Sequence, residues 1–481
     1  MAGRTVLACA CLALCACGST VSIDDGSLKT KPSPSTPPSS PPSSDDTVVV
    51  ADPFPTSPPC GEASGAPELS WAYRAGTAKA QETVAAVATD AAGNVYFTGS
   101  GSTDVDFGGG PMAGHAGYVV SLTADGAFRW ARFLQGSDWG SAIAVSPSGQ
   151  IVVAGSFMGP LELGDEVYDA NQRNMAFVAA LTSMGEVVWY RAFGEGQINI
   201  ATGVAITPAE DVIVVGSFQH GADFGGGMRH TDGNRDAFVA AYDAGGNHLW
   251  DVTPPGPGTE IPIGVAVDGA GQITLAGHFS SEWDLGGGTR HADGIQAAFV
   301  LHLDDQGGYL WDWTHGFDGH GLGHAVAADS LGQLYVTGEF HGSLSFADTA
   351  HPPTSELSSY VVSFDAAGTE RWGRVYEGTG GARAFGIAVD DSDRVLLAGH
   401  FAGQATFGSS PQVSAGGYDT FALMLTGAGD HLWDRTFGGS KDEEGHAIVR
   451  GCTGTLFVGG RDPGNDTGSL VSMDALLIAF D

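Results

Sequence analysis

Residues 264–279, which read GVAVDGAGQITLAGHF, form two short apolar runs on either side of a Gly-Ala-Gly turn. Short runs that are rich in Val, Ile and aromatic residues and bounded by Gly or Asp are typical of β-strands. A third run follows at 298–303, and a fourth carries Leu310 and Trp311. No long segment shows the periodicity of a helix. The stretch therefore predicts a unit of four short antiparallel strands, here called a, b, c and d in chain order.

This unit recurs along the chain. A tryptophan marks strand d at steps of 59 to 61 residues, at Trp71, Trp130, Trp189, Trp250, Trp311, Trp372 and Trp433. A constant step indicates one structural unit copied in tandem. Four-stranded units arranged radially are the blades of a β-propeller. We therefore predict an all-β fold, a seven-bladed β-propeller, in which the tryptophans pack blades rather than stack on a ligand.

Strand c repeats two core positions four residues apart. The first is filled by Tyr118, Phe177, Phe238, Phe299, Tyr360, Phe421 and Leu476. The second is filled by Leu122, Leu181, Tyr242, Leu303, Phe364, Leu425 and Phe480. An even step keeps both side chains on one face of a strand, so each blade is expected to bury the same pair.

The two ends of the repeat array complement each other. Residues 68–73 form a strand d with no strand a, b or c before it, whereas Phe480 ends a strand c with no strand d after it. The N-terminal strand is therefore expected to complete the seventh blade and close the ring, which removes both exposed sheet edges. The propeller is predicted to span 68–481.

The repeats resemble a known family. The motif Trp433-Asp434-Arg435-Thr436-Phe437-Gly438-Gly439-Ser440, and the segment from Ala205-Ile206 to Gly216-Ser217-Phe218, are similar to SBBP-type seven-bladed β-propeller repeats. Repeats of that type occur on bacterial surface and secreted proteins, notably of myxobacteria. The resemblance covers roughly 69–481 and implies a fold and a surface location. It supplies no catalytic residues.

The N-terminus predicts export. A positive residue, Arg4, precedes an apolar stretch that is too short for a membrane span and is typical of a signal peptide, here 1–16. The end of this stretch, Leu14 to Ser19, resembles a bacterial lipobox, which implies that Cys17 is lipidated. Residues 17–67 then form a Ser/Pro-rich tether. Gly18-Ser19 favours the outer membrane or the cell surface as the location. The alternative is a metal or disulfide cluster of Cys9, Cys11, Cys15 and Cys17.

The charge limits the partners. The chain carries 20 Lys plus Arg against 55 Asp plus Glu, a formal net charge of −35. Phosphate backbones need clustered cations, so a nucleic-acid partner is not expected. Contact with a membrane is expected only through the N-terminal lipid. We expect a monomer.

Two cysteines remain beyond the lipobox, Cys60 and Cys452. Cys452 is expected in the a–b turn of the seventh blade, and Cys60 precedes the strand that enters this blade from the same side. An exported protein with two such cysteines favours a disulfide between them. The pair would lock the ring closure.

One set of polar residues stands out at the inner ends of strands a and b, around the predicted mouth of the central channel. After the glycine that closes strand b come Ser100, Ser156, Ser217, His278, Glu339, His400 and Gly460. Two residues before the apolar core of strand a lie Ala85, Ser141, Thr202, Ile263, His324, Phe385 and His446. His278, His324, Glu339, His400 and His446 are the candidate site, for a divalent transition metal or an anionic ligand. The alternative is a set of separate, solvated histidines.

The long b–c and d–a connections share the face that carries this set, and long loops on a rigid scaffold are where function concentrates. We therefore expect a non-enzymatic, lipid-anchored surface protein whose loop face binds a protein or a glycan. The chain contains none of the linear nucleophile, zinc-protease or phosphate-loop motifs. Two alternatives stay open. One is a hydrolase or lyase, metal-dependent or not, with its site at the channel mouth, and the other is a structural spacer of the envelope.

Overall fold

The chain divides into two units, Met1–Ser44 and Asp45–Asp481, and the described residues all belong to the second. The computed structural model describes residues 67–76, 82–101, 104–112, 114, 116–163, 166–292, 294–315, 320–346, 349–408, 410–451, 454–462 and 474–480. The predicted signal peptide, Cys17, the tether up to residue 66, Cys60 and Cys452 lie outside these ranges, so they stay predictions. Within the ranges, no helix has the length and apolarity that a membrane crossing needs.

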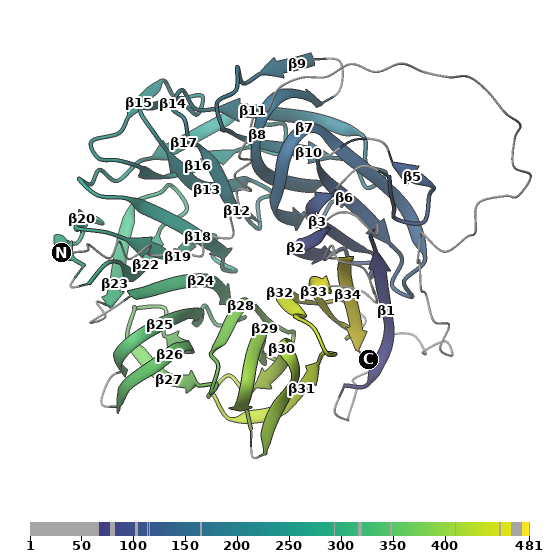
Figure 1. The fold of residues 1–481 in the computed structure, drawn as a ribbon. Coiled ribbons are helices and arrows are strands. Elements are labelled where there is room, and N and C mark those ends of the chain that lie inside the picture. The colour runs from purple at the N-terminus through teal and green to yellow at the C-terminus, as the bar shows by residue number, and fades with distance from the viewer. Residues whose placement is uncertain are drawn as a thin grey trace, which may run out of the picture. The chain divides into compact units, whose positions relative to one another are not determined.

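The second unit is a seven-bladed β-propeller (Figure 1). Blades 1 and 2 share the long strand β7 and comprise β2 (Thr83–Thr89), β3 (Val95–Gly101), β6 (Ala116–Leu122), β7 (Phe128–Val145), β8 (Ile151–Leu163), β9 (Glu166–Asp169), β10 (Met175–Leu181) and β11 (Val187–Phe193). Blade 3 comprises β12 (Ile200–Ile206), β13 (Val212–Phe218), β16 (Asp236–Tyr242) and β17 (His248–Val252). Blade 4 comprises β18 (Glu260–Val267), β19 (Ile273–Phe279), β22 (Ala297–Leu303) and β23 (Tyr309–His315).

The remaining blades follow the same order. Blade 5 comprises β24 (His320–Ala328), β25 (Leu334–Phe346), β26 (Thr349–Phe364) and β27 (Glu370–Tyr376). Blade 6 comprises β28 (Ala382–Val389), β29 (Val395–Thr406), β30 (Pro411–Leu425) and β31 (His431–Phe437). Blade 7 comprises β32 (Glu444–Arg450), β33 (Leu456–Asp462), β34 (Asp474–Phe480) and β1 (Leu69–Ala75).

The predicted ring closure is confirmed. Strand β1 pairs antiparallel with β34, from Leu69 opposite Phe480 to Ala75 opposite Ala475. Strand a of every blade packs against strand a of both neighbouring blades, including β2 against β32. These innermost strands surround the ring axis in Figure 1. No strand edge is therefore left open at the junction of the two ends of the array.

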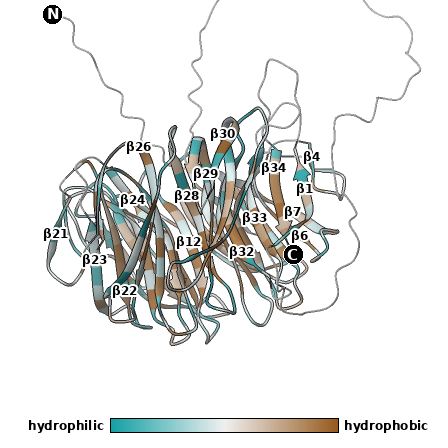
Figure 2. Ribbon diagram, turned by 90° about the horizontal axis from the view of Figure 1, so that it is seen from below, coloured by the Kyte–Doolittle hydropathy of each residue, from teal (hydrophilic) through white to brown (hydrophobic). Residues whose placement is uncertain are grey.

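The predicted core columns of strand c are also confirmed, because all fourteen side chains are 4% exposed or less. Brown, hydrophobic colour follows the strands in Figure 2. The tryptophans of strand d link blades: Nε1 of Trp71 donates to the carbonyl of Ala124 at 3.2 Å, and Nε1 of Trp189 donates to that of Ala244 at 2.9 Å. Trp130, Trp311 and Trp372 make the same bond to the c–d turn of the following blade. Their role is packing between blades.

The b–c connections of three blades contain short strands of their own. In blades 1, 3 and 4 they form small hairpins of β4 (Val105–Asp106) with β5 (Pro111–Met112), β14 (Gly221–Asp223) with β15 (Met228–His230), and β20 (Glu282–Asp284) with β21 (Thr289–His291). Oδ1 of Asp284 accepts from the N–H groups of Gly286 and Gly288 at 2.8 and 3.1 Å. This Asx turn explains the repeated Asp and Gly residues without a nucleotide.

Candidate functional site

Every strand a contains a β-bulge at the same place. In β18, Pro262 pairs with Gly277 and Gly264 pairs with Ala276, so Ile263 is the extra residue. The bulged residues of the seven blades are Ala85, Ser141, Thr202, Ile263, His324, Phe385 and His446. They are the strand a positions that the sequence analysis selected. A bulge bends its strand and re-aims a side chain, which is how these residues come to face the ring axis.

A glycine of strand b lies opposite each bulge. A Cβ on Gly277 would lie 2.1 Å from the carbonyl oxygen of Ile261, and one on Gly460 would lie 1.9 Å from that of Glu444. No side chain fits there, so glycine is required. The residue after this glycine is Ser100, Ser156, Ser217, His278, Glu339, His400 or Arg461. The prediction of Gly460 at this position in blade 7 was wrong, because the strand register places Arg461 there.

The bulged residues of blades 5, 6 and 7 touch one another. The ring of Phe385 lies 4.7 Å from the ring of His324 and 5.7 Å from that of His446, measured between centroids. The ring of His400 is 5.2 Å from Phe385. Side chains of different blades therefore converge around the axis. We call the following group the axial cluster: His278, His320, His324, Glu339, Arg383, Phe385, His400, Glu444, His446 and Arg461.

Glu339 is the centre of the first half of the axial cluster. Its Oε1 lies 3.4 Å from Nε2 of His320, and its Oε2 lies 3.5 Å from Nε2 of His324. Nε of Arg383, from the next blade, is 3.4 Å from the same Oε2. Burial alone would raise the pKa of Glu339, but the histidines and Arg383 hold it below its usual range. Glu339 is therefore an anion with a cationic partner.

Glu444 is the centre of the second half. It forms an ion pair with Arg461, and its Oε2 lies 3.3 Å from Nε2 of His446. Burial is opposed here by His446 and Arg461, which hold the pKa of Glu444 below its usual range. His400 is 3% exposed, and burial lowers its pKa to about 3. His400 is thus a neutral imidazole at physiological pH, with Nδ1 buried and without a hydrogen-bond partner among the described residues.

Arg235 lies beside the axial cluster in blade 3. Its guanidinium donates from an Nη atom to Oγ of Ser217 at 2.6 Å, and its Nε is buried without an acceptor among the described residues. Burial lowers the pKa of Arg235 to about 10, and no carboxylate offsets this effect. Burial, together with the charges of His324 and Arg235, lowers the pKa of His278 to about 3. Nδ1 of His278 is likewise buried and without a partner.

The structure thus brings the five predicted residues to the same axis in two groups, His278 and His324 with Glu339, and His400 with His446. It adds His320, Arg383, Glu444 and Arg461, which were not predicted from the sequence. A signal for two of them was present. Arg383 and Glu444 are 61 residues apart, at a position that is Ile261 in blade 4 and Leu322 in blade 5. Charged residues in a column that is uncharged in the other blades mark a site.

In the part of the chain that the structure describes, no group of three or more His, Cys, Asp or Glu side chains is arranged to hold a metal ion. A transition metal at the five predicted residues stays a sequence prediction. The buried, unpaired imidazole nitrogens and Arg235 fit a ligand that accepts hydrogen bonds equally well.

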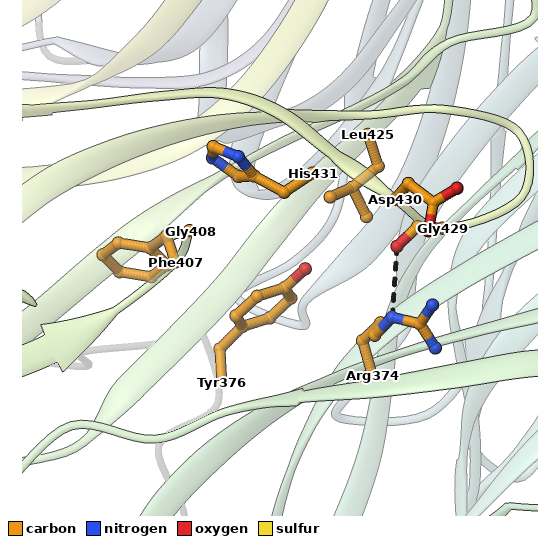
Figure 3. A pocket seen from close by; sticks show the side chains of 8 residues that line it. All are labelled: Arg374, Tyr376, Phe407, Gly408, Leu425, Gly429, Asp430 and His431. Atoms are coloured by element: carbon orange, nitrogen blue, oxygen red, sulfur yellow. Dashed lines mark hydrogen bonds between the residues drawn. The ribbon is translucent and has the colours of Figure 1, made fainter. Parts of the chain in front are cut away.

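A separate hollow lies between blades 5 and 6, and no residue of the axial cluster lines it (Figure 3). It is lined by Arg374, Tyr376, Phe407, Gly408, Leu425, Gly429, Asp430 and His431. Nε of Arg374 donates to the carbonyl of Gly429 at 3.1 Å, as the dashed line shows, and Nε2 of His431 lies 2.7 Å from Oδ1 of Asp434. Arg374 and His431 are thus engaged in contacts between and within blades. This hollow is therefore a weaker candidate than the axial cluster.

Known proteins show distant similarity to this chain. No family model matches the chain. An uncharacterized WD repeat-containing protein of Acanthamoeba polyphaga mimivirus is 21% identical over 356 residues, which cover 59% of this chain and 26% of that protein. The chain therefore spans about a quarter of the length of this curated relative.

Solved propeller structures are similar at lower identity. The WD40 domain of Neurospora crassa Pan2 is 9% identical, with a TM-score of 0.44 over 83% of this chain and 89% of that chain. The β-propeller domain of the Trilobed protease from Pyrococcus furiosus is 8% identical, with a TM-score of 0.44 over 84% of this chain and 95% of that chain. At such identities no activity transfers between proteins.

Proposed function

We propose that this protein is a non-enzymatic, lipid-anchored propeller of the bacterial cell surface, of the SBBP type, whose loop face binds a protein or a glycan. The observation that carries the proposal is the axial cluster. It contains buried polar atoms without partners, on a rigid seven-bladed scaffold, where a protein that binds nothing would carry satisfied or apolar groups. Its outer members are accessible, since the side chains of His320, Arg383 and His446 are 24%, 19% and 22% exposed.

The direction of the strands supports a proposed orientation in which the face with the axial cluster points away from the membrane. Leu69, the first residue of β1, pairs with Phe480, the last of β34. The chain therefore enters the propeller on the side of the tight a–b and c–d turns. The axial cluster lies at the opposite ends of strands a and b. A lipid before residue 67 would leave the cluster facing away from the membrane.

The anchor is tested by Cys17→Ala. In Triton X-114 phase separation, we expect the wild-type protein in the detergent phase and the variant in the aqueous phase. The physical reason is that a formal net charge of −35 and strands whose apolar side chains face the core leave only the lipid to partition. Cys15→Ala is the control and should stay in the detergent phase. Detergent partitioning of the Cys17→Ala protein would show a different membrane contact.

The binding face is tested by Arg383→Gln. We expect this variant to lose at least tenfold in affinity for its partner, found by a glycan array or by cross-linking on whole cells. Removing the guanidinium leaves the Glu339 carboxylate without its cation, and truncating one member of a buried charge pair weakens binding strongly. Arg191→Gln, on the exposed outer strand β11, is the matched control. Equal affinity of both variants would contradict the proposal, and turnover of a bound glycan would favour the hydrolase or lyase alternative.

A further inference from the structure

The charges around the ring axis do not balance. Three arginines reach this region, Arg235, Arg383 and Arg461, and two glutamates face them. Glu339 pairs with Arg383, and Glu444 pairs with Arg461. Arg235 has no carboxylate partner among the described residues, although it is only 7% exposed. In a chain with a net charge of −35, a buried guanidinium without an anion is unexpected, because acidic side chains outnumber cations nearly three to one.

Among the described residues, the Arg235 guanidinium has one hydrogen-bond acceptor, Oγ of Ser217, and no acceptor for its Nε. Nε of Arg235 and Nδ1 of His278 are both buried and without a partner, and Oγ of Ser217 already holds the other end of the guanidinium. His278 is 2% exposed and Ser217 is 0% exposed. Nε–H of Arg235, His278 in its Nδ1–H tautomer and the Ser217 hydroxyl would together supply the hydrogen-bond donors that an oxyanion binds.

The same position in the other blades supports a specific role. Arg235 directly precedes strand c, and the corresponding residues are Asn174, Gln296, Leu357 and Tyr418 in blades 2, 4, 5 and 6. None of these is charged. Packing of a blade therefore does not need a cation at this position. The guanidinium is a local addition of blade 3 beside the axial cluster.

We infer that Arg235, Ser217 and His278 form a subsite for a carboxylate group of the ligand, which supplies the third anion of the axial charge set. A single unpaired guanidinium matches a monoanion that accepts two parallel N–H bonds, which is the geometry of an arginine–carboxylate pair. A phosphate dianion would bring a second negative charge close to Glu339, for which no cation remains. The inference rests on the proposed function and narrows its ligand to one that carries a carboxylate, such as a uronic acid residue of a glycan.

The test uses the full-length protein and simple anions as probes. Thermal unfolding and calorimetric titration are measured with sodium acetate, sodium D-glucuronate, inorganic phosphate and sodium chloride at equal ionic strength. We expect glucuronate and acetate to bind and to raise the melting temperature above the value in chloride. Arg235→Gln should lower the affinity for glucuronate at least tenfold, and Arg235→Lys should lower it less. Arg229→Gln, which removes an exposed arginine paired with Asp251, is the control and should not change the affinity.

Every other outcome contradicts either the carboxylate subsite or the proposed function. No carboxylate binding by the wild-type protein would overturn the inference even if Arg235→Gln failed to fold. So would unchanged affinity in Arg235→Gln, or tighter binding of phosphate than of carboxylates. If carboxylates do not bind but Arg383→Gln still weakens the surface partner, the inference fails and the proposed function stands. If glucuronate binding depends on Arg235 while no partner depends on Arg383, the proposed function fails alone.

Discussion

Deletion of residues 67–76, which removes β1, is expected to leave no cooperatively folded propeller at 37 °C. Strand β1 is the only neighbour of β34 on its outer side, and it buries Trp71, Tyr73 and Ala75 to 7% exposure or less. Truncation of one buried aromatic residue alone costs about 3–5 kcal/mol, and the whole domain is stable by about 5–15 kcal/mol. Urea unfolding followed by tryptophan fluorescence, together with size-exclusion chromatography, measures the effect.

The matched deletion is 18–50, within the predicted tether, which should leave the melting temperature unchanged. Single substitutions in β1 test the same strand with a smaller perturbation. Tyr73→Ala should be strongly destabilising, since its hydroxyl also donates to the carbonyl of Phe107 at 2.7 Å. Leu69→Ala should be nearly neutral, since Leu69 is 51% exposed. Equal melting temperatures for the two deletions would disprove ring closure by β1.

Glu260→Gln is expected to stabilise the protein at pH 8 by about 2–4 kcal/mol, and by much less at pH 5. Glu260 is fully buried, and its carboxyl oxygens have no well-formed hydrogen bond among the described residues. Burial, and then the charge of Asp236, raise the pKa of Glu260 to about 8, against a smaller opposing effect of the Gly258 N–H. The folded state thus favours the protonated acid. The stability that protonated Glu260 contributes is complete below the pKa of about 4.5 that Glu260 has in the unfolded chain. This contribution is lost as the pH rises towards 8.

Blade 3 supports this interpretation with an internal comparison. Asn199 occupies the position 61 residues before Glu260, and its amide donates to the carbonyls of Asn174 and Gly196 at 2.8 and 3.1 Å. An amide satisfies these carbonyl groups at any pH, whereas a carboxylate repels them. Free energies of unfolding in urea at pH 5, 6, 7 and 8 measure the difference, with exposed Glu186→Gln as the control. Parallel curves for wild type and Glu260→Gln would contradict the prediction.

The core of each blade could be predicted because its signal is local. Phe299 and Leu303 are four residues apart on one strand, so alternation of side chains places both on the same face without any knowledge of the rest of the fold. The 59- to 61-residue step then carries this result to all seven blades. The bulge in strand a breaks such alternation. In strand b of blade 7, the sequence pattern did not identify the axial residue correctly. Gly459 and Gly460 both fit the position of the glycine opposite the bulge, and only strand pairing shows that Gly460 occupies it and that Arg461 follows.

The sequence by itself determined the number of blades, the strand order, the buried columns and the partial membership of the axial site, because each depends on a pattern within one repeat or on the constant spacing of the repeats. Tertiary structure alone decided which side chains meet. Glu339 of blade 5 meets Arg383 of blade 6, and Phe385 lies between histidines of three blades, since ring closure brings seven bulged strands to one axis. The unpaired state of Arg235 is likewise a property of the assembled ring. Its missing anion becomes visible only when Glu339 and Glu444 have been assigned to Arg383 and Arg461.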